Sequence, residues 1–178
     1  MHPKFTMAFC LALAAAFALP TVNATAQNFS HSWLMDTGHT TCLRDTRAGL
    51  QMTSECDTKK GFSDYWSYDV TKDEEGTLTW ENTPGACIQL VTTDANCSKD
   101  TGTNLVTSQC IGEWYSQWKI EGKGGSDVQI KLSKGPRLHD CNLCMCRKAC
   151  SYPTTEICAV VDVCDGPSDC NWIIQHGP

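Results

Sequence analysis

Residues Cys110–Ile120, which read CIGEWYSQWKI, carry the pattern that decides the fold: a cysteine followed eight residues later by a tryptophan. The same arrangement runs from Cys164 to Trp172 over eight residues and from Cys56 to Trp66 over ten. The three cysteines that open these segments stand 54 and 54 residues apart. A recurrence at a constant period indicates an internal repeat.

An earlier cysteine precedes each of these segments. The three openings are Thr41-Cys42-Leu43, Ala86-Cys87-Ile88 and Asp140-Cys141-Asn142-Leu143. The distance from the first to the second cysteine is 14 residues in the first block and 23 in the other two. We therefore expect three repeats, over approximately residues 33–76, 77–124 and 125–178, with a shortened loop in the first.

The segments around the tryptophans have the pattern of short strands. Residues 66–70 and 77–80 alternate apolar and polar side chains on either side of the charged turn 72–76. Residues 118–120 and 128–132 flank the glycine-rich turn 121–125 in the same way. Alternation with period two around a turn predicts β-hairpins, and no stretch of 12 or more residues shows a helical apolar period. The sequence predicts an all-β fold.

The two ends of the chain complement each other. The third repeat stops after Trp172-Ile173-Ile174 and lacks the strand that follows the tryptophan in repeats one and two. Ser32–Met35 lies before Cys42 as Trp80 lies before Cys87, so it can supply that strand. We expect the first strand to pair with the last, which would leave no exposed sheet edge there.

The N-terminus has the form of a secretory signal peptide. Lys4 precedes the apolar run Met7–Leu19, and the small residues Ala24-Thr25-Ala26 follow it. The apolar run of 13 residues is shorter than the ~20 that a membrane-spanning helix needs. We expect residues 1–26 to be removed and residues 27–178 to form a single secreted, extracellular domain.

The number of cysteines agrees with secretion. Twelve of the 13 lie beyond residue 26, an even number that predicts up to six disulfides in an oxidising compartment. The dense run Cys141–Cys150 could also suggest thiolate ligands of zinc or of a cluster. Secretion favours disulfides instead, so we expect no metal and no cofactor. Spacing alone leaves open the partners of Cys97, Cys144, Cys146, Cys150, Cys158 and Cys170, and Cys97 could reach across repeats.

Charge excludes two classes of partner. Beyond residue 26 the chain carries 13 Lys and Arg against 20 Asp and Glu, a net charge of −7. The longest basic clusters are the pairs Lys59-Lys60 and Arg147-Lys148. Such a surface repels phosphate, so we expect neither nucleic acid nor an anionic membrane as partner.

Taken together, three blocks of cysteine plus aliphatic residue, second cysteine and tryptophan resemble the ricin B-type β-trefoil lectin family. The resemblance covers essentially all of residues 27–178 and implies a β-trefoil that binds carbohydrate or a glycoprotein. We expect the protein to be a monomer. The resemblance also implies one disulfide within each repeat: Cys42–Cys56, Cys87–Cys110 and Cys141–Cys164. The tryptophans would then fill the core around the pseudo-threefold axis.

The sugar-site positions of that family differ here. An aspartate commonly stands two residues after the first cysteine, where this chain has Arg44, Gln89 and Leu143. The stacking aromatic residue two positions before the second cysteine is replaced by Ser54, Ser108 and Asp162. The Asn-Gln pair before the tryptophan is replaced by Ser63-Asp64, Tyr115-Ser116 and Asp169-Cys170. Any sugar recognition must therefore use other residues.

Repeat two offers the best alternative site. Carbohydrate sites combine an aromatic ring face with a few directional polar groups. The residues of this kind are Gln89, Asp94, Asn104, Trp114 and Tyr115, with Asp45 of repeat one as a weaker addition. The same residues would also be explained by ordinary loop polarity beside a partly buried aromatic pair.

Two further features complete the set of expectations. Asn28-Phe29-Ser30 and Asn96-Cys97-Ser98 match the N-glycosylation sequon, which predicts a glycoprotein. No Gly-x-Ser-x-Gly, His-Glu-x-x-His or phosphate-binding loop is present, and the histidines have no nucleophile or acid in a catalytic pattern. We expect no enzyme.

Two functions remain open. The first is a ricin B-like carbohydrate-binding module with a diverged site. The second is a secreted interaction protein on the same scaffold, such as an effector or a protease inhibitor that recognises an extracellular protein through its loops.

Overall fold

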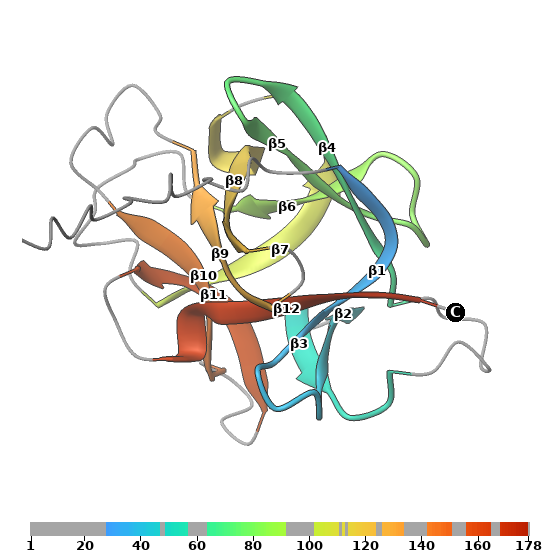
Figure 1. Cartoon of the computed structure of the whole chain (residues 1–178), viewed down its shortest axis with the longest axis vertical. Helices are drawn as coiled ribbons and strands as arrows, with labels where there is room; N and C mark the ends of the chain where they lie inside the picture. Colours follow the sequence, from blue (N-terminus) through green and yellow to red (C-terminus); the bar gives the residue numbers. More distant parts are fainter. Residues whose placement is uncertain are drawn as a thin grey trace, which may run out of the picture.

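The computed structural model shows an almost entirely β chain (Figure 1). It describes residues 28–46, 49–56, 64–91, 102–110, 112, 114–123, 126–133, 142–150, 156–164 and 168–177. The expected signal peptide lies outside these residues. Within them no helix is long and apolar enough to cross a membrane.

Six of the described strands close into a barrel. They are β1 (Phe29–Met35), β4 (Trp66–Lys72), β5 (Glu75–Trp80), β8 (Trp118–Lys123), β9 (Ser126–Leu132) and β12 (Asn171–His176). Each pairs antiparallel with the next around the ring, and β12 pairs with β1 to close it. The hairpins β4–β5 and β8–β9 are those that the alternating pattern predicted.

Three further hairpins cap one end of this barrel. They are β2–β3 (Cys42–Thr46 and Gly49–Thr53), β6–β7 (Ala86–Leu90 and Thr103–Gln109) and β10–β11 (Leu143–Ala149 and Ile157–Val163). Strand β11 contacts both other hairpins by pairing with β3 and with β7. The short 3-10 helices η2 (Trp114–Ser116) and η3 (Ser168–Cys170) precede β8 and β12. We refer to β1–β4, β5–β8 and β9–β12 as repeats one, two and three.

The expected pairing of the first and last strands is confirmed. Leu34 lies opposite Ile174, and the register extends from Ser32 to Met35. Figure 1 shows β1 and β12, the blue and red ends of the described chain, side by side. Beyond the strands, the Gly177 amide donates to the His31 carbonyl over 2.8 Å. Strand pairing therefore leaves neither chain end as a free barrel edge.

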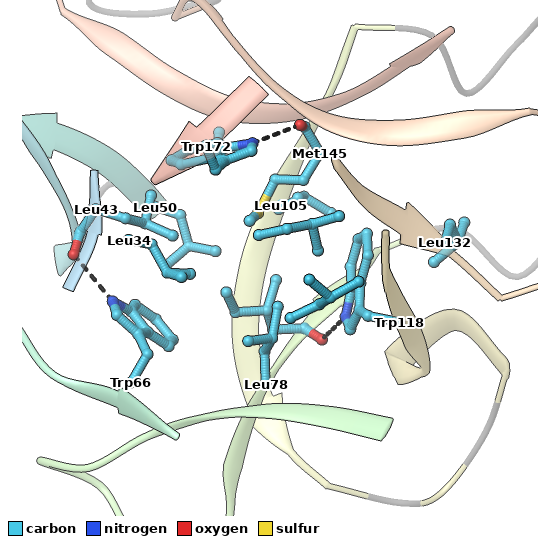
Figure 2. Packing of buried hydrophobic residues seen from close by; sticks show 14 of the residues in the cluster. Leu34, Leu43, Leu50, Trp66, Leu78, Leu105, Trp118, Leu132, Met145 and Trp172 are labelled. Atoms are coloured by element: carbon cyan, nitrogen blue, oxygen red, sulfur yellow. Dashed lines mark hydrogen bonds between the residues drawn. The ribbon is translucent and has the colours of Figure 1, made fainter. Parts of the chain in front are cut away.

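The three repeated tryptophans are fully buried in one core cluster. Their indole N–H groups donate to the carbonyls of Leu43, Ile88 and Met145 over 3.0, 2.9 and 2.8 Å (Figure 2). Each large apolar ring is thus buried without leaving its one polar atom unpaired. The three acceptors also define equivalent positions in the three repeats.

These equivalent positions correct one expected disulfide. Leu43 and Ile88 directly follow the bridged cysteines of Cys42–Cys56 and Cys87–Cys110, and both of these bridges form as expected. Met145 directly follows Cys144, and Cys144 is the residue bonded to Cys164. The expected Cys141–Cys164 bridge is therefore wrong, and Cys141 itself lies outside the described residues.

The register explains why Cys144 takes the repeated position. It lies opposite Lys131 of β9, as Cys42 lies opposite Met35 and Cys87 opposite Thr79. Since side chains alternate along a strand, Cys144 and Cys146 both point away from the face that carries Met145 into the core. Cys146 bonds to Cys170, and Cys150 bonds to Cys158. Repeat three therefore has a sulfur-rich cluster on its outer face.

Candidate functional site

The residues expected to bind a ligand in repeat two are only partly brought together. Gln89 lies on β6 opposite Val106, and Asn104 lies two residues from Val106 on β7, so the two amides are diagonal neighbours on one face of the hairpin. Tyr115 is half-buried in η2 and packs against the core. Asp94 and the side chain of Trp114 lie outside the described part of the chain.

The Asp45 side chain does not lie with Gln89 and Asn104. Its carboxylate accepts a hydrogen bond from the Thr107 hydroxyl, which links the hairpin of repeat one to that of repeat two. Burial raises the pKa of Asp45 above its usual value, and the Thr107 hydrogen bond offsets only part of that effect. The side chain serves a contact between hairpins and does not join Gln89 and Asn104.

Two positions in each repeat can be compared, because the lectin family that the sequence resembles uses them for sugar. The first is two residues after the repeated cysteine, and the second is two residues before the tryptophan. They are Arg44 and Asp64 in repeat one, Gln89 and Ser116 in repeat two, and Cys146 and Cys170 in repeat three. With Cys144 as the repeated cysteine, the third repeat has Cys146 where the sequence comparison placed Leu143.

In repeat one this pair of positions forms an ion pair. Arg44 donates from Nε and Nη2 to the two carboxylate oxygens of Asp64, each over 2.7 Å. A further bond from Nη2 reaches the Glu55 carbonyl. Asp64 is 1% exposed, so its charge is compensated almost entirely by Arg44. The hydrogen bonds that Arg44 donates to Asp64 raise the pKa of Arg44 above its usual value, although burial acts to lower it.

In repeat three the same two positions form the Cys146–Cys170 disulfide. Both cysteines are buried among the other sulfurs of that repeat. A disulfide has no donor or acceptor of useful strength for a sugar hydroxyl. In repeats one and three, the groups at these two positions are therefore already bonded to each other and are not available to a ligand.

In repeat two the corresponding pair is not joined in this way. Ser116 is fully buried, while Gln89 is half-buried and its Oε1 atom is enclosed without a hydrogen-bond partner in the described structure. The Oδ1 atom of Asn104 is enclosed without a partner in the same sense. Buried acceptors without a donor are uncommon in proteins and call for an explanation. At these two positions repeat two thus differs from its counterparts, although the Nε2 atom of Gln51 in repeat one is also enclosed without a partner in the described structure.

The possible glycosylation site at Asn28 can be placed, whereas Asn96 lies outside the described residues. Asn28 is exposed, and its Oδ1 atom accepts a hydrogen bond from the Val70 amide over 2.8 Å. Glycosylation modifies the nitrogen of the side-chain amide, so this contact does not block it. Phe29, the middle residue of the sequon, is buried and stacks on Tyr68.

A second polar cluster, missed by sequence reasoning, lies where β1 meets the β4–β5 hairpin. Glu81 accepts hydrogen bonds from the Ser67 hydroxyl, the His31 amide and the His31 ring. Burial alone would raise the pKa of Glu81, but these hydrogen bonds together hold it below its usual value. The His31 ring also stacks on Tyr65 at 3.7 Å between centroids, and Tyr65 stacks on Trp33. With Tyr65 only 2% exposed, this stack has no open ring face at that residue and acts to hold β1 in place.

Comparisons with known proteins support the fold and assign no family. No protein-family model and no curated protein matches the chain. A designed threefold-symmetric protein, ThreeFoil, matches with a TM-score of 0.61 at 12% identity, over 82% of this chain and 98% of its own. A mosquitocidal holotoxin matches with a TM-score of 0.64 at 11% identity, over 85% of this chain and 18% of its own.

The cytolethal distending toxin of Haemophilus ducreyi is also similar, with a TM-score of 0.57 at 16% identity, over 88% of this chain and 86% of its own. Identities this low carry the fold alone. The matched structures are β-trefoil proteins. The described strands, the tryptophan core and these likenesses together show that the chain folds as a disulfide-bonded β-trefoil.

Proposed function

We propose that this β-trefoil is a secreted carbohydrate-binding module whose ligand site lies on the hairpin of repeat two. The observation that supports it is the difference among the three equivalent position pairs. An ion pair joins Arg44 to Asp64 and a disulfide joins Cys146 to Cys170, whereas Gln89 retains an enclosed acceptor without a partner. Sugar hydroxyls are donors of the kind that such an acceptor lacks, and the half-buried Gln89 side chain must turn outward for its enclosed oxygen to accept from one.

Asn104 strengthens this assignment because it adds a second amide on the same hairpin face. Amide side chains offer both a donor and an acceptor, which suits the alternating hydroxyls of a sugar ring. Tyr115, half-buried beside the core, and Trp114, in the same 3-10 helix, supply aromatic residues nearby in the chain. The similar structures include toxin binding domains, which is consistent with a binding module.

A glycan array probed with the oxidised protein lacking residues 1–26 tests the proposal. We expect binding to at least one glycan class, weakened on the order of tenfold in Gln89→Ala or Asn104→Ala because a site built on hydrogen bonds discriminates through them. Gln109→Ala is the matched control, since Gln109 is an exposed amide on the same strand as Asn104. A blank array, or equal losses in all three variants, would contradict a sugar site in repeat two.

The alternative is a secreted interaction protein, an effector or a protease inhibitor, on the same scaffold. It is favoured by the ion pair in repeat one and the disulfide in repeat three. These bonds occupy two of the three places where the lectin family that the sequence resembles holds sugar. Inhibition assays against common extracellular proteases would distinguish the inhibitor from other binding proteins. Under this alternative the binding surface must lie elsewhere on the molecule.

A further inference from the structure

The three hairpins of the cap meet at three equivalent seams. In each seam, the residue three positions after a repeated cysteine faces the strand of the next repeat. These residues are Asp45, Leu90 and Arg147. Their counterparts across the seam are Thr107, Val161 and Met52, which occupy equivalent positions because each lies opposite the residue that accepts an indole hydrogen bond.

Two of these seams are closed. Between repeats one and two, the Thr107 hydroxyl donates to the Asp45 carboxylate. Between repeats two and three, Leu90 and Val161 are both completely buried in the core cluster, and the Gly102 amide donates to the Val161 carbonyl over 2.7 Å. Polar pairing closes one seam and apolar packing closes the other.

The third seam, between repeats three and one, is joined where Cys158 of β11 pairs with Gln51 of β3, but it stays open at Arg147 and Met52. Arg147 and Met52 line a groove of about 840 Å³ instead of closing on each other. The groove continues between the loop at Thr40 and Thr41 and the end of the β10–β11 hairpin. A space of this size is in the range that proteins use to hold a ligand or a short peptide segment.

Apolar side chains form part of the wall of this groove. Met52, Ala149 and Ile157 lie along it, and Ile157 is 44% exposed, which makes it one of the large apolar side chains that the described structure leaves in contact with solvent. Ala149 and Ile157 lie directly opposite each other on the hairpin. The hairpin therefore extends past the core and presents an apolar strip to the groove.

The charges around the groove favour a cationic occupant. Arg147 donates to the Asp169 carbonyl and lies over Trp172, and burial lowers its pKa while Asp36 and Asp169 act in the opposite direction. Lys148 forms an ion pair with Asp162. Asp36, Glu156 and Asp169 line the groove as well, which makes three carboxylates against two cations. The Asp36 carboxylate accepts hydrogen bonds from Thr40 and Thr41, so Glu156 and Asp169, both exposed, are the carboxylates at the rim that a partner can reach. The net field attracts positive charge.

We propose that this groove binds an extended segment of another protein that carries lysine or arginine beside an apolar side chain. The apolar strip would take the apolar side chain, and the carboxylates at the rim would pair with the cation. None of the described residues that line the groove is aromatic, so it lacks the ring face on which a sugar stacks. This site is separate from the proposed sugar site in repeat two, so either can fail without the other.

Fluorescence anisotropy with three labelled hexapeptides tests the proposal directly. The probe is Gly-Leu-Lys-Leu-Lys-Gly, and the comparison peptides replace lysine by glutamate or leucine by serine. We expect the probe to bind more tightly than either by on the order of tenfold, since each comparison removes one of the two contributions. Added salt should weaken the probe's binding because the attraction is partly electrostatic.

Ile157→Arg locates the site, and Val163→Arg is its matched control. Both side chains are 44% exposed and both lie on β11, but only Ile157 lines the groove. We expect Ile157→Arg to weaken probe binding on the order of tenfold and Val163→Arg to change it by less than about twofold. Ala149→Arg should repeat the loss, and near-ultraviolet circular dichroism should show that all three variants keep the native fold.

Three results would overturn the proposal. They are no measurable binding of the probe at millimolar concentration, equal affinity for the glutamate peptide, or equal effects of arginine at positions 157 and 163. A glycan bound by the native protein and lost in Ile157→Arg, while Gln89→Ala leaves it unchanged, would likewise overturn it and would move sugar binding to the groove.

Discussion

Repeats one and three join the same two positions by different chemistry. In repeat one Arg44 and Asp64 form a charged pair, and in repeat three Cys146 and Cys170 form a covalent bond. Each link ties the start of the cap hairpin to the segment that leads into the buried tryptophan. The comparison shows that two unlike chemistries can join these positions, and that repeat two, with Gln89 and Ser116, has neither an ion pair nor a disulfide there.

The largest expected effect comes from breaking the tie in repeat one. Asp64→Ala would leave Arg44 with an uncompensated charge beside the core, and we expect a loss of about 3 kcal/mol in the free energy of unfolding. Denaturant titration measures it. Glu74→Ala is the control, because the Glu74–Lys119 pair is also a close ion pair, 2.8 Å, but is exposed on both sides. That variant should lose less than about 1 kcal/mol, and equal losses would contradict a special role for the buried pair.

Breaking the tie in repeat three should have a smaller effect. Cys146→Ser with Cys170→Ser opens a loop whose ends are 24 residues apart, but Cys144–Cys164 still restricts the same region of the unfolded chain. We expect a loss of about 2 kcal/mol, at the lower end for a native disulfide. The transition midpoint in guanidinium chloride measures it. If this variant were less stable than Asp64→Ala, the covalent tie would be the more important one.

Exchanging the chemistry should have the smallest effect. Arg44→Cys with Asp64→Cys places a cysteine pair in repeat one at the positions that bond in repeat three. If the backbones are equivalent, the new bridge forms and stability stays within about 1 kcal/mol of the native protein, because a disulfide of this loop length replaces the lost ion pair. Intact mass with and without reduction detects the bridge. Two free thiols would show that the two repeats differ in backbone geometry at this point.

The sequence was sufficient to predict the fold because the fold depends on a few bulky, repeated side chains. The tryptophans and the second cysteines stand at regular intervals, and the strands beside them alternate cleanly. The pairing of β1 with β12 followed from a strand missing at one end and present at the other. These features depend on local residue patterns and on the pairing of the first strand with the last, and both can be recognised in the sequence alone.

The error at Cys141 has a physical origin in the density of thiols. Spacing favoured Cys141, which lies 23 residues before Cys164 just as Cys87 lies 23 before Cys110. The better signal was the next residue, since Leu43 and Ile88 are apolar core residues and Met145 is apolar, whereas Asn142 is polar and exposed. A cysteine on a strand bonds according to the face it occupies, and spacing along the chain does not report that face.

The candidate sites were less accessible to prediction. Gln89 and Asn104 could be named as polar residues of repeat two, but only strand register shows that they share a face. The Arg44–Asp64 pair joins residues far apart in the chain, and nothing in their neighbourhoods marks them as partners. The groove arises because the seam between repeats three and one stays open at Arg147 and Met52, which depends on how three hairpins pack together and has no local signature in the sequence.

The disulfides and the barrel close on different scales. Each bridge in the described structure joins cysteines of one repeat, 8 to 24 residues apart. The loop that each bridge closes is short, so closing it costs little conformational entropy. The barrel closes only when the last strand is in place, because β12 pairs with both β1 and β9. During synthesis the first repeat can therefore oxidise while the third has yet to emerge, and native thiol pairing does not have to wait for the ring of strands to be complete.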